Sequence, residues 1–346
     1  GRVSICVTFA AMPSSIITDA APLLAPFAVS LGDPAGIGPE IVAKSWVMRE
    51  ARGLPAFFAV GDAASLRAVW LGPVERIDSP EEAAQVFPRA LPCLQVGEAG
   101  EVIPGAPGVD GARVAFQSLE VAVGLARSGS AAGIVTAPVG KEQLYGVGFT
   151  HPGQTEFVAA SCGIAPDDAV MMLAGPSLRV VPVTVHVALA RVPALLSADL
   201  IYRRTAIAAQ ALMRDFAIAR PRIAIAGLNP HAGEDGRMGG EDTAIIAPAV
   251  ERLRADGLDV RGPLPADTMF HAAARAKYDL AVCMYHDQAL IPLKALDFDQ
   301  GVNVTLGLPI IRTSPDHGTA FDIAGTGTAH VSPMLAAIRM AARCAE

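Results

Sequence analysis

The sequence predicts an α/β fold with a mostly parallel, doubly wound sheet. Short apolar runs, each suited to a buried strand, alternate along the chain with segments that carry the 3.6-residue spacing of amphipathic helices. Several of these runs end in glycine or polar side chains, as strands do before a loop that leads into a helix. Hydrophobic residues make up 52% of the 346 residues, which is enough to cover both faces of such a sheet with helices.

The first half of the chain supplies most of the predicted parallel strands. We expect strands at residues 26–31, 56–60, 94–96 and 133–135, and helices at 39–48, 63–71 and 111–127. Between the first strand and the first helix lies the glycine-rich segment GDPAGIGPEI, residues 32–41. Its glycine spacing matches neither the dinucleotide fingerprint nor the Walker loop, so on its own it favours a structural tight turn over a phosphate site.

The second half interrupts this parallel pattern. Residues 170–173 and 178–187 are predicted to pair as antiparallel strands across a Gly-Pro-Ser turn, which places His186 near the end of the second strand. One long helix is predicted from Pro193 to Phe216. Further strands are expected at 222–226, 280–285 and around 302–306, with a helix at 245–255 and a short helix that carries Lys294.

Composition excludes several classes of partner. The 27 Lys and Arg residues are scattered and the net charge is -7, which argues against nucleic acid as a partner. No stretch reaches the roughly 20 apolar residues that span a bilayer, so no membrane association is expected. The five cysteines are far apart and form no CxxC pattern, which indicates reduced thiols in a cytoplasmic protein. Residues 1–25 are predicted to lie outside the fold.

A polar cluster follows the apolar run at 280–285. His286, Asp287 and Gln288 come directly after it, and Lys294, Asn303 and Arg312 follow within the next 25 residues or so. An imidazole, two kinds of cation, an amide and carboxylates together suit an anionic, oxygen-rich small molecule. From this segment alone a satisfied structural turn with solvated cations is about equally plausible.

Three histidines occupy similar positions in the predicted fold. His186, His231 and His286 each lie at or just past a predicted strand end, and imidazole is the commonest transition-metal ligand. No HxH or HxxxH spacing links them, and a lone strand histidine is more often structural. Two other polar residues also have structural explanations, because Thr155 and Asp267 each lie where a helix N-cap is expected.

Six segments, in order along the chain, resemble the 4-hydroxythreonine-4-phosphate dehydrogenase family. They are GDPAGIGPEI, GLNPHAGE, GPLPADT, MYHDQ, GVNVTLGLPIIRTS and DHGTAFDIAG, and the likeness runs from about Phe27 to near the C-terminus. The first and last segments also resemble the wider isocitrate and isopropylmalate dehydrogenase fold. That resemblance implies two α/β domains with a cleft between them: residues 26–150 plus 300–346 on the NAD side, and residues 151–299 carrying the metal ligands and the dimer contact.

The resemblance also assigns roles to individual residues. The metal ligands would be His186, His231 and His286, contributed across a homodimer interface, with one divalent zinc, cobalt or magnesium ion per site. The phosphorylated substrate would contact Gln154, Thr155, Lys294, Asn303 and Arg312. Proton transfer, or the orientation of its partners, would involve Lys294, Asp267 and Asp287. The cofactor, NAD or NADP, would contact Asp316, His317, Gly318 and Asp322.

The activity that follows from the resemblance is an oxidation of 4-phosphohydroxy-L-threonine with decarboxylation to 3-amino-2-oxopropyl phosphate, in pyridoxal 5'-phosphate biosynthesis. Gln154 departs from the family, which mostly has histidine there, and Gln cannot become cationic or carry a proton. A related dehydrogenase of 4-phospho-D-threonate or erythronate therefore remains an alternative. A metal-dependent hydrolase without NAD and a non-catalytic binding module are more distant ones.

Overall fold

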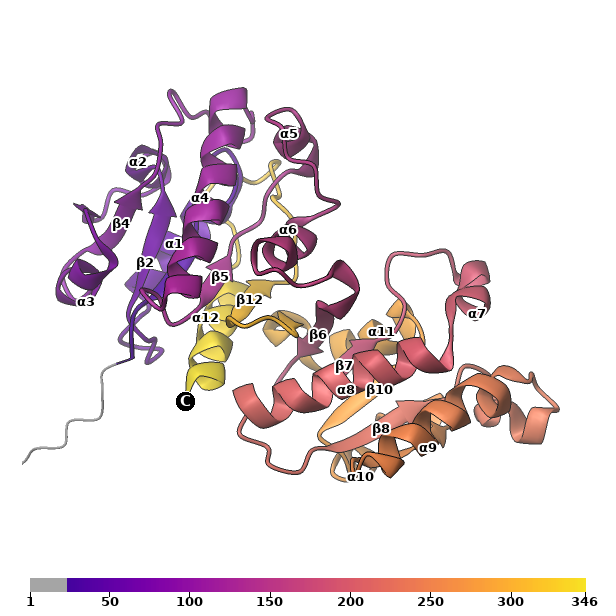
Figure 1. The fold of residues 1–346 in the computed structure, drawn as a ribbon. Helices are drawn as coiled ribbons and strands as arrows, with labels where there is room; N and C mark the ends of the chain where they lie inside the picture. The colour runs from indigo at the N-terminus through magenta and orange to yellow at the C-terminus, as the bar shows by residue number, and fades with distance from the viewer. Residues whose placement is uncertain (1–23) are drawn as a thin grey trace, which may run out of the picture.

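The computed structural model describes residues 24–346, so the predicted N-terminal extension lies almost wholly outside the described residues. These residues form one sheet of 12 strands in the order β3-β4-β2-β1-β5-β12-β11-β6-β7-β10-β8-β9 (Figure 1). The strands are β1 Phe27–Ser30, β2 Phe57–Gly61, β3 Val74–Ile77, β4 Leu91–Gln95, β5 Ile134–Thr136, β6 Val170–Ala174, β7 Arg179–Pro182, β8 Arg222–Ala226, β9 Asp259–Leu264, β10 Leu280–Cys283, β11 Val302–Leu306 and β12 Arg312–Pro315.

The sheet consists of two parallel blocks joined by two strands. The first block runs from β3 to β12 and the second from β7 to β9, and every neighbouring pair within each block is parallel. Between them lie β11 and β6, and the pairings β12-β11, β11-β6 and β6-β7 are all antiparallel. Because three successive pairings reverse direction, the two blocks run in opposite directions. We call β11 and β6 the junction strands.

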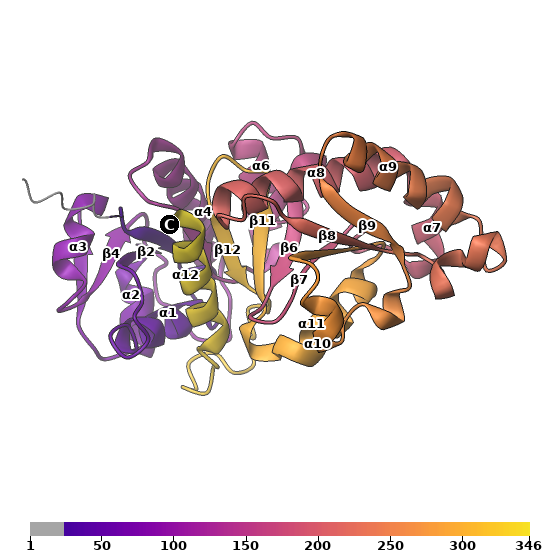
Figure 2. The same cartoon turned by 90° about the horizontal axis from the view of Figure 1, so that it is seen from below.

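Helices cover both faces of each block, as predicted. They are α1 Gly38–Val47, α2 Ala63–Val69, α3 Ala83–Val86, α4 Val109–Ser128, α5 Lys141–Tyr145, α6 Gln154–Ser161, α7 Val192–Leu195, α8 Ala198–Asp215, α9 Ala247–Ala255, α10 Ala272–Arg275, α11 His286–Asp297 and α12 Ser332–Ala345. On the second block, α8 and α9 lie on one face and α10 and α11 on the other (Figure 2).

Apolar side chains from both blocks share one large hydrophobic cluster. A single hydrophobic cluster joins residues of α1 and α12, over the first block, to residues of α8 and α9 over the second. Separate clusters lie beneath α4 and α6 and beneath α11. The predicted division into two domains stays a prediction, since a continuous sheet fixes strand pairing and not the independence of its parts. In the part of the chain that is described, no helix is long and apolar enough to cross a membrane.

Three predicted element boundaries were wrong. The predicted helix from Pro193 to Phe216 is two helices, because the Ser197 hydroxyl accepts a hydrogen bond from the Leu200 N–H at 3.1 Å and caps a new helix, α8. Strand β7 ends at Pro182, so His186 lies in the turn beyond it with a φ of 53°. Asp267 lies inside a 3-10 turn, Ala266–Thr268, whose N-cap residue is Pro265, so the capping explanation fails.

One buried carboxylate ties three segments of the first block together. Asp62 follows β2 and is 2% exposed. One of its oxygens accepts hydrogen bonds from the Ala64 N–H and the Gln95 side-chain amide, both at 2.9 Å. The other oxygen accepts from the Ala99 N–H at 2.9 Å. Burial alone would raise the pKa of Asp62, but these hydrogen bonds outweigh it and the pKa is lowered.

We predict that Asp62→Asn lowers the free energy of unfolding by about 1–3 kcal/mol at neutral pH, because the new amide cannot accept from all three donors. A carboxylate with a lowered pKa stabilises the fold above its ordinary pKa and loses this effect as the pH falls through the lowered value. The difference from wild type should therefore shrink below roughly pH 4. Urea unfolding at pH 7 and at acid pH measures it, and an equal difference at both would contradict the assignment.

Candidate active site

A polar cavity lies where the two blocks meet. It has a volume of about 350 Å³, and we call it the junction cavity. Its walls come from both blocks and both junction strands: Thr136, Pro138, Lys141, Gln154, Met171, His186, His286, Leu290, Asn303, Ser314, Pro315, Asp316 and His317. Six residues predicted for three different roles therefore share one cavity, namely Gln154, His186, His286, Asn303, Asp316 and His317.

Three polar atoms of the junction cavity have no partner. The side-chain oxygens of Gln154 and Asn303 and the Nε2 atom of His317 are buried, and within residues 24–346 none of them makes a hydrogen bond. Nearly all buried polar groups in proteins are hydrogen-bonded, so three orphans around one hollow indicate a ligand that supplies the missing partners. The free groups are two acceptor oxygens and one ring nitrogen, and together they suit a small polar molecule.

Gln154 opens helix α6 rather than extending into solvent. Its side-chain amide donates to the Ala137 carbonyl at 3.3 Å, which leaves its oxygen as the free atom. The N-cap residue of α6 is Gly153, so Thr155 does not cap the helix. The Thr155 hydroxyl instead accepts a hydrogen bond from Arg312.

Arg312 is a buried hub behind the cavity wall. It is 4% exposed, and its guanidinium donates to the hydroxyls of Thr305 at 2.8 Å, Thr136 at 3.0 Å and Thr155 at 3.1 Å. These hydroxyls belong to β11, β5 and α6, so one side chain on β12 holds three other elements. Burial lowers the pKa of Arg312 to about 10, while nearby Glu156 acts in the opposite direction. Its predicted contact with substrate stays a prediction.

Lys294 forms an ion pair with Asp316, a residue of the cavity wall. Their Nζ and Oδ2 atoms are 2.8 Å apart, with Lys294 on α11 and Asp316 just past β12. The pair therefore links the helix that begins with His286 to the loop predicted to hold the cofactor. Lys294 was predicted as a catalytic and substrate-binding residue and Asp316 as a cofactor contact, and no pattern in the sequence indicated that the two would pair.

Two of the three predicted metal ligands meet within one chain. The rings of His186 and His286 have centroids 5.7 Å apart, and both line a second cavity of about 330 Å³ beside the junction cavity. The His286 Nδ1 atom lies 2.7 Å from Asp287, which fixes the orientation of this ring. His231 lies in a separate turn, Pro230–Gly236. Within the described part of a single chain, no group of three His, Cys, Asp or Glu side chains is placed to hold a metal.

Two polar side chains hold the backbone around these histidines. Gln288 accepts from the Met284 N–H at 2.7 Å and donates to the Gly227 carbonyl at 2.8 Å, so it joins the start of α11 to the loop after β8. Asp242 is 1% exposed and accepts from the Leu228 N–H at 2.8 Å. It also accepts from the Asn229 side chain at 2.9 Å, which shapes the loop that carries His231.

The predicted cofactor loop packs against the glycine-rich segment. The Ile37 N–H donates to the Thr319 carbonyl at 3.0 Å, and a side chain at Gly36 would meet this carbonyl at 3.1 Å. His317 lies in the same loop, with its Nδ1 atom 3.1 Å from the Gly318 carbonyl. Segment 32–41, predicted to form a tight turn, thus packs closely against residues 316–322.

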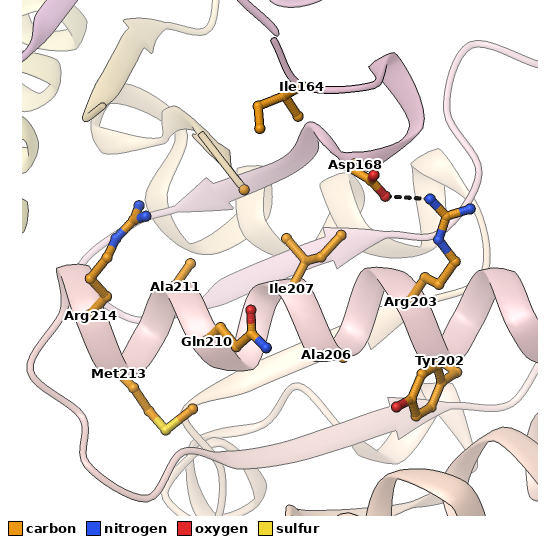
Figure 3. Close-up of a pocket in the computed structure, with 11 residues that line it drawn as sticks. Ile164, Asp168, Tyr202, Arg203, Ala206, Ile207, Gln210, Ala211, Met213 and Arg214 are labelled. Atoms are coloured by element: carbon orange, nitrogen blue, oxygen red, sulfur yellow. Dashed lines mark hydrogen bonds and ion pairs between the residues drawn. The ribbon is translucent and has the colours of Figure 1, made fainter. Parts of the chain in front are cut away.

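A larger cavity lies elsewhere in the described residues and is not this site. A hollow of about 790 Å³ runs along the outer face of α8, as Figure 3 shows. Its walls are the ion pair between Asp168 and Arg203 and mainly apolar side chains, among them Ile164 and Ile207. None of the predicted site residues lines it. Chemistry, and not volume, therefore identifies the junction cavity as the candidate site.

The fold and the polar cavity at its junction define an α/β enzyme with a dehydrogenase-like fold. A solved terephthalate 1,2-cis-dihydrodiol dehydrogenase from Burkholderia xenovorans LB400 is similar over 92% of this chain and 97% of its own, with 31% identity and a TM-score of 0.65. The family model of the pyridoxal phosphate biosynthetic protein PdxA matches residues 54–341. The chain belongs to the PdxA family.

Relatives named 4-hydroxythreonine-4-phosphate dehydrogenase are more similar still. The one from Erythrobacter litoralis is 59% identical over 325 residues, covering 92% of this chain and 96% of its own. The one from Zymomonas mobilis is 54% identical over 321 residues, covering 93% and 96%. A solved structure of that name from Klebsiella pneumoniae has 41% identity and a TM-score of 0.86, covering 93% and 98%. The predicted family and the predicted fold are confirmed, and the chain is an oxidoreductase.

We predict that Thr136→Val lowers the free energy of unfolding by about 1–3 kcal/mol, because it leaves one N–H of a buried guanidinium without an acceptor. Most of this cost should disappear when the same change is made in an Arg312→Met background, since no donor is then left unpaired. Chemical denaturation of the wild type, both single variants and the double variant measures the coupling. Equal costs in the two backgrounds would show that Thr136 does not serve Arg312.

Proposed function

We propose that this chain oxidises 4-phosphohydroxy-L-threonine with NAD and a divalent metal ion, and that decarboxylation gives 3-amino-2-oxopropyl phosphate for pyridoxal 5'-phosphate biosynthesis. The printed names of its relatives support this substrate. The observation that carries the proposal is the junction cavity, where three buried polar atoms lack partners beside a pair of histidines. We expect the enzyme to act in the cytoplasm.

The residues present fit a metal ion. His186 and His286 offer two imidazoles within one cavity, and a third ligand, His231, is expected from a second copy of the chain. A bound divalent ion supplies Lewis-acid chemistry that lowers the pKa of a substrate hydroxyl. Asp287 fixes the ring of His286 through its Nδ1 atom, which leaves the Nε2 atom facing outward as the ligand. In this role Asp287 is a positioning residue.

The chain's own cations and amides would bind the substrate. Lys294, paired with Asp316, and Arg312, bonded to Thr136, would supply positive charge close to the cavity wall. Gln154, Thr155 and Asn303 would supply hydrogen bonds. Release of carbon dioxide would leave an enolate that needs a proton. Lys294, whose Nζ atom lies 2.8 Å from Asp316, would stabilise that enolate or donate the proton. Asp267 remains a further candidate for proton transfer. NAD or NADP accepts the hydride, with residues 316–322 as its expected contacts.

A homodimer with shared sites fits the exposed apolar surface. Val187, Leu189 and Leu195 are 41%, 66% and 40% exposed, and the first two line the same cavity as the histidine pair. Apolar side chains beside a polar site favour a protein cover over water. A second copy placed there would bring its own His231 toward His186 and His286.

We predict that turnover depends on both the substrate and an added metal ion. Metal-stripped protein should form NADH from 4-phosphohydroxy-L-threonine and NAD only after zinc, cobalt or magnesium is added. The comparison substrate is 4-phospho-D-threonate, because Gln154 in place of the family's histidine favours a second candidate activity on sugar acids. Turnover of the threonate alone would assign the sugar-acid activity to the protein. Absence of NADH formation with both substrates would refute the proposal.

We also predict that the active site is shared between two copies of the chain. Variants His231→Ala and His286→Ala should each be inactive, yet a mixture unfolded and refolded together should regain about a quarter of wild-type activity, because half of the random dimers contain one intact site. Refolding each variant alone is the control. If all three ligands came from one chain, the mixture would stay inactive.

A further inference from the structure

One lysine of the junction cavity has no part in the function proposed above. Among the 13 residues of the cavity wall, Lys141 is the single lysine or arginine. It is the first residue of α5 and the last of the segment TAPVGK, which leads out of β5. An anionic ligand in this cavity therefore meets one wall cation, and that cation is Lys141.

The two cations expected to bind the substrate are both engaged elsewhere. Arg312 is 4% exposed, and both of its NH₂ groups donate to threonine hydroxyls. The Nζ atom of Lys294 lies 2.8 Å from the carboxylate of Asp316. Neither Arg312 nor Lys294 belongs to the cavity wall. Their charge acts from behind or beside the wall, so direct contact with an anion requires another residue.

The ammonium group of Lys141 is available for that contact. Among residues 24–346 it forms no ion pair and donates no hydrogen bond, so its three N–H groups can all serve a ligand. Its Nζ atom lies beside the start of α6, because a Cβ atom built on Gly153 would be 3.8 Å from it. The same Cβ would be 3.0 Å from Oε2 of Glu156, which is the carboxylate on this side of the cavity.

Positive charge outweighs negative charge on this side. Thr136, at the end of β5, lines the cavity and accepts a hydrogen bond from Arg312. Lys141 and the guanidinium behind Thr136 are two cations, and Glu156 supplies one carboxylate. The side of the cavity that follows β5 is therefore positive on balance, and an anion placed there gains electrostatic energy.

The histidine pair lies on the other parallel block. His186 follows β7 and His286 follows β10, whereas Lys141 follows β5 of the first block. All three line the junction cavity. A substrate whose hydroxyl lies at the histidines can thus extend an anionic group toward Lys141. A phosphate monoester carries roughly 1.5 to 2 negative charges at neutral pH, so it gains more from two cations than a carboxylate does.

We propose that the Lys141 ammonium binds the phosphate group of the substrate directly, while Arg312 adds its charge from behind Thr136. The inference rests on the proposed function, since it takes the substrate to be a phosphorylated hydroxy-amino acid. It gives the segment TAPVGK a role in substrate binding, and it makes Lys141 a specificity-determining residue.

The first experiment measures steady-state kinetics of Lys141→Met, with metal and NAD in excess. This change keeps the length of the side chain and removes the charge. KM for 4-phosphohydroxy-L-threonine should rise by about tenfold or more, as expected for loss of a hydrogen bond between charged groups. The value of kcat should change by less than about threefold, because the lost contact is made equally in the bound substrate and in the transition state.

Two further variants control this measurement. Lys141→Arg keeps the positive charge and should recover most of the loss in KM. Lys277→Met removes an exposed lysine outside the junction cavity and should behave as the wild type. A fall in kcat with unchanged KM, or a failure of Lys141→Arg to recover more than Lys141→Met retains, would overturn the inference.

The second experiment separates phosphate from the other anionic groups that Lys141 could bind. Dissociation constants are measured by calorimetry for 4-hydroxy-L-threonine, which lacks the phosphate, and for NAD. Lys141→Met should leave both unchanged. Equal weakening of the phosphorylated and unphosphorylated amino acids would assign Lys141 to the carboxylate, and weaker binding of NAD would assign it to the cofactor phosphates. Either result overturns the inference.

The third experiment uses the wild type alone and so does not depend on a variant that folds. Lysines are labelled by reductive methylation in metal-loaded protein without NAD, so the substrate is not consumed, and each site is read by mass spectrometry. The phosphorylated substrate should slow labelling of Lys141 and leave Lys277 unchanged, and 4-hydroxy-L-threonine should protect neither. Unchanged labelling of Lys141 in a wild type that turns over the substrate overturns the inference alone. A wild type without turnover refutes the proposed function itself.

Discussion

The buried guanidinium of Arg312 is the interaction on which the junction depends. Burying a cation is costly unless its donors are paired. Here three threonine hydroxyls from three different elements accept from its two NH₂ groups, while its Nε–H has no partner among the described residues. Within residues 24–346 no carboxylate forms an ion pair with it, and its pKa of about 10 keeps it charged at neutral pH. Because Thr136 both binds this guanidinium and lines the junction cavity, a positive charge without a counter-ion lies just behind the cavity wall. Such a charge favours an anion in front of it, which agrees with a phosphorylated substrate.

The order of strands and helices could be predicted because it depends on local apolar periodicity, and the strands at 27–30, 57–61, 134–136 and 280–283 lie where expected. Errors arose where one polar side chain decides the outcome. Ser197 starts a new helix inside an otherwise continuous helical pattern. Two strands were missed because their patterns are weak: β3 is short and partly exposed, and β9 contains glycine and proline. Thr136 and Thr305 were missed as partners of Arg312, since threonine in a strand is an ordinary strand residue until the guanidinium is placed against it.

The residues gathered in the junction cavity were named by resemblance to a family, and no spacing in the sequence would have grouped Gln154, His186 and Asn303. What the structure adds is backbone strain at two of the named histidines. His186 and His231 both adopt left-handed conformations, with φ values of 53° and 55°, as do Ala232, Glu234 and Asp235. Each such non-glycine residue costs on the order of 1–2 kcal/mol. Strain of this kind persists where surrounding contacts hold it, and around His231 the hydrogen bonds of Asp242 do so.

Two cavities of opposite electrostatic character lie on either side of the contact between Asp33 and Pro138. Arg312 and Lys294 make the junction side positive, although Asp316 partly neutralises Lys294. The smaller side is a cavity of about 190 Å³ between the glycine-rich segment and the start of α4, and Asp33 and Glu101 make it negative. The negative charge of a phosphorylated substrate is therefore stabilised on the junction side and disfavoured on the smaller side. The backbone hydrogen bond from Asp33 to Pro138 joins these two environments, so their relative placement depends on the main chain and not on flexible side chains.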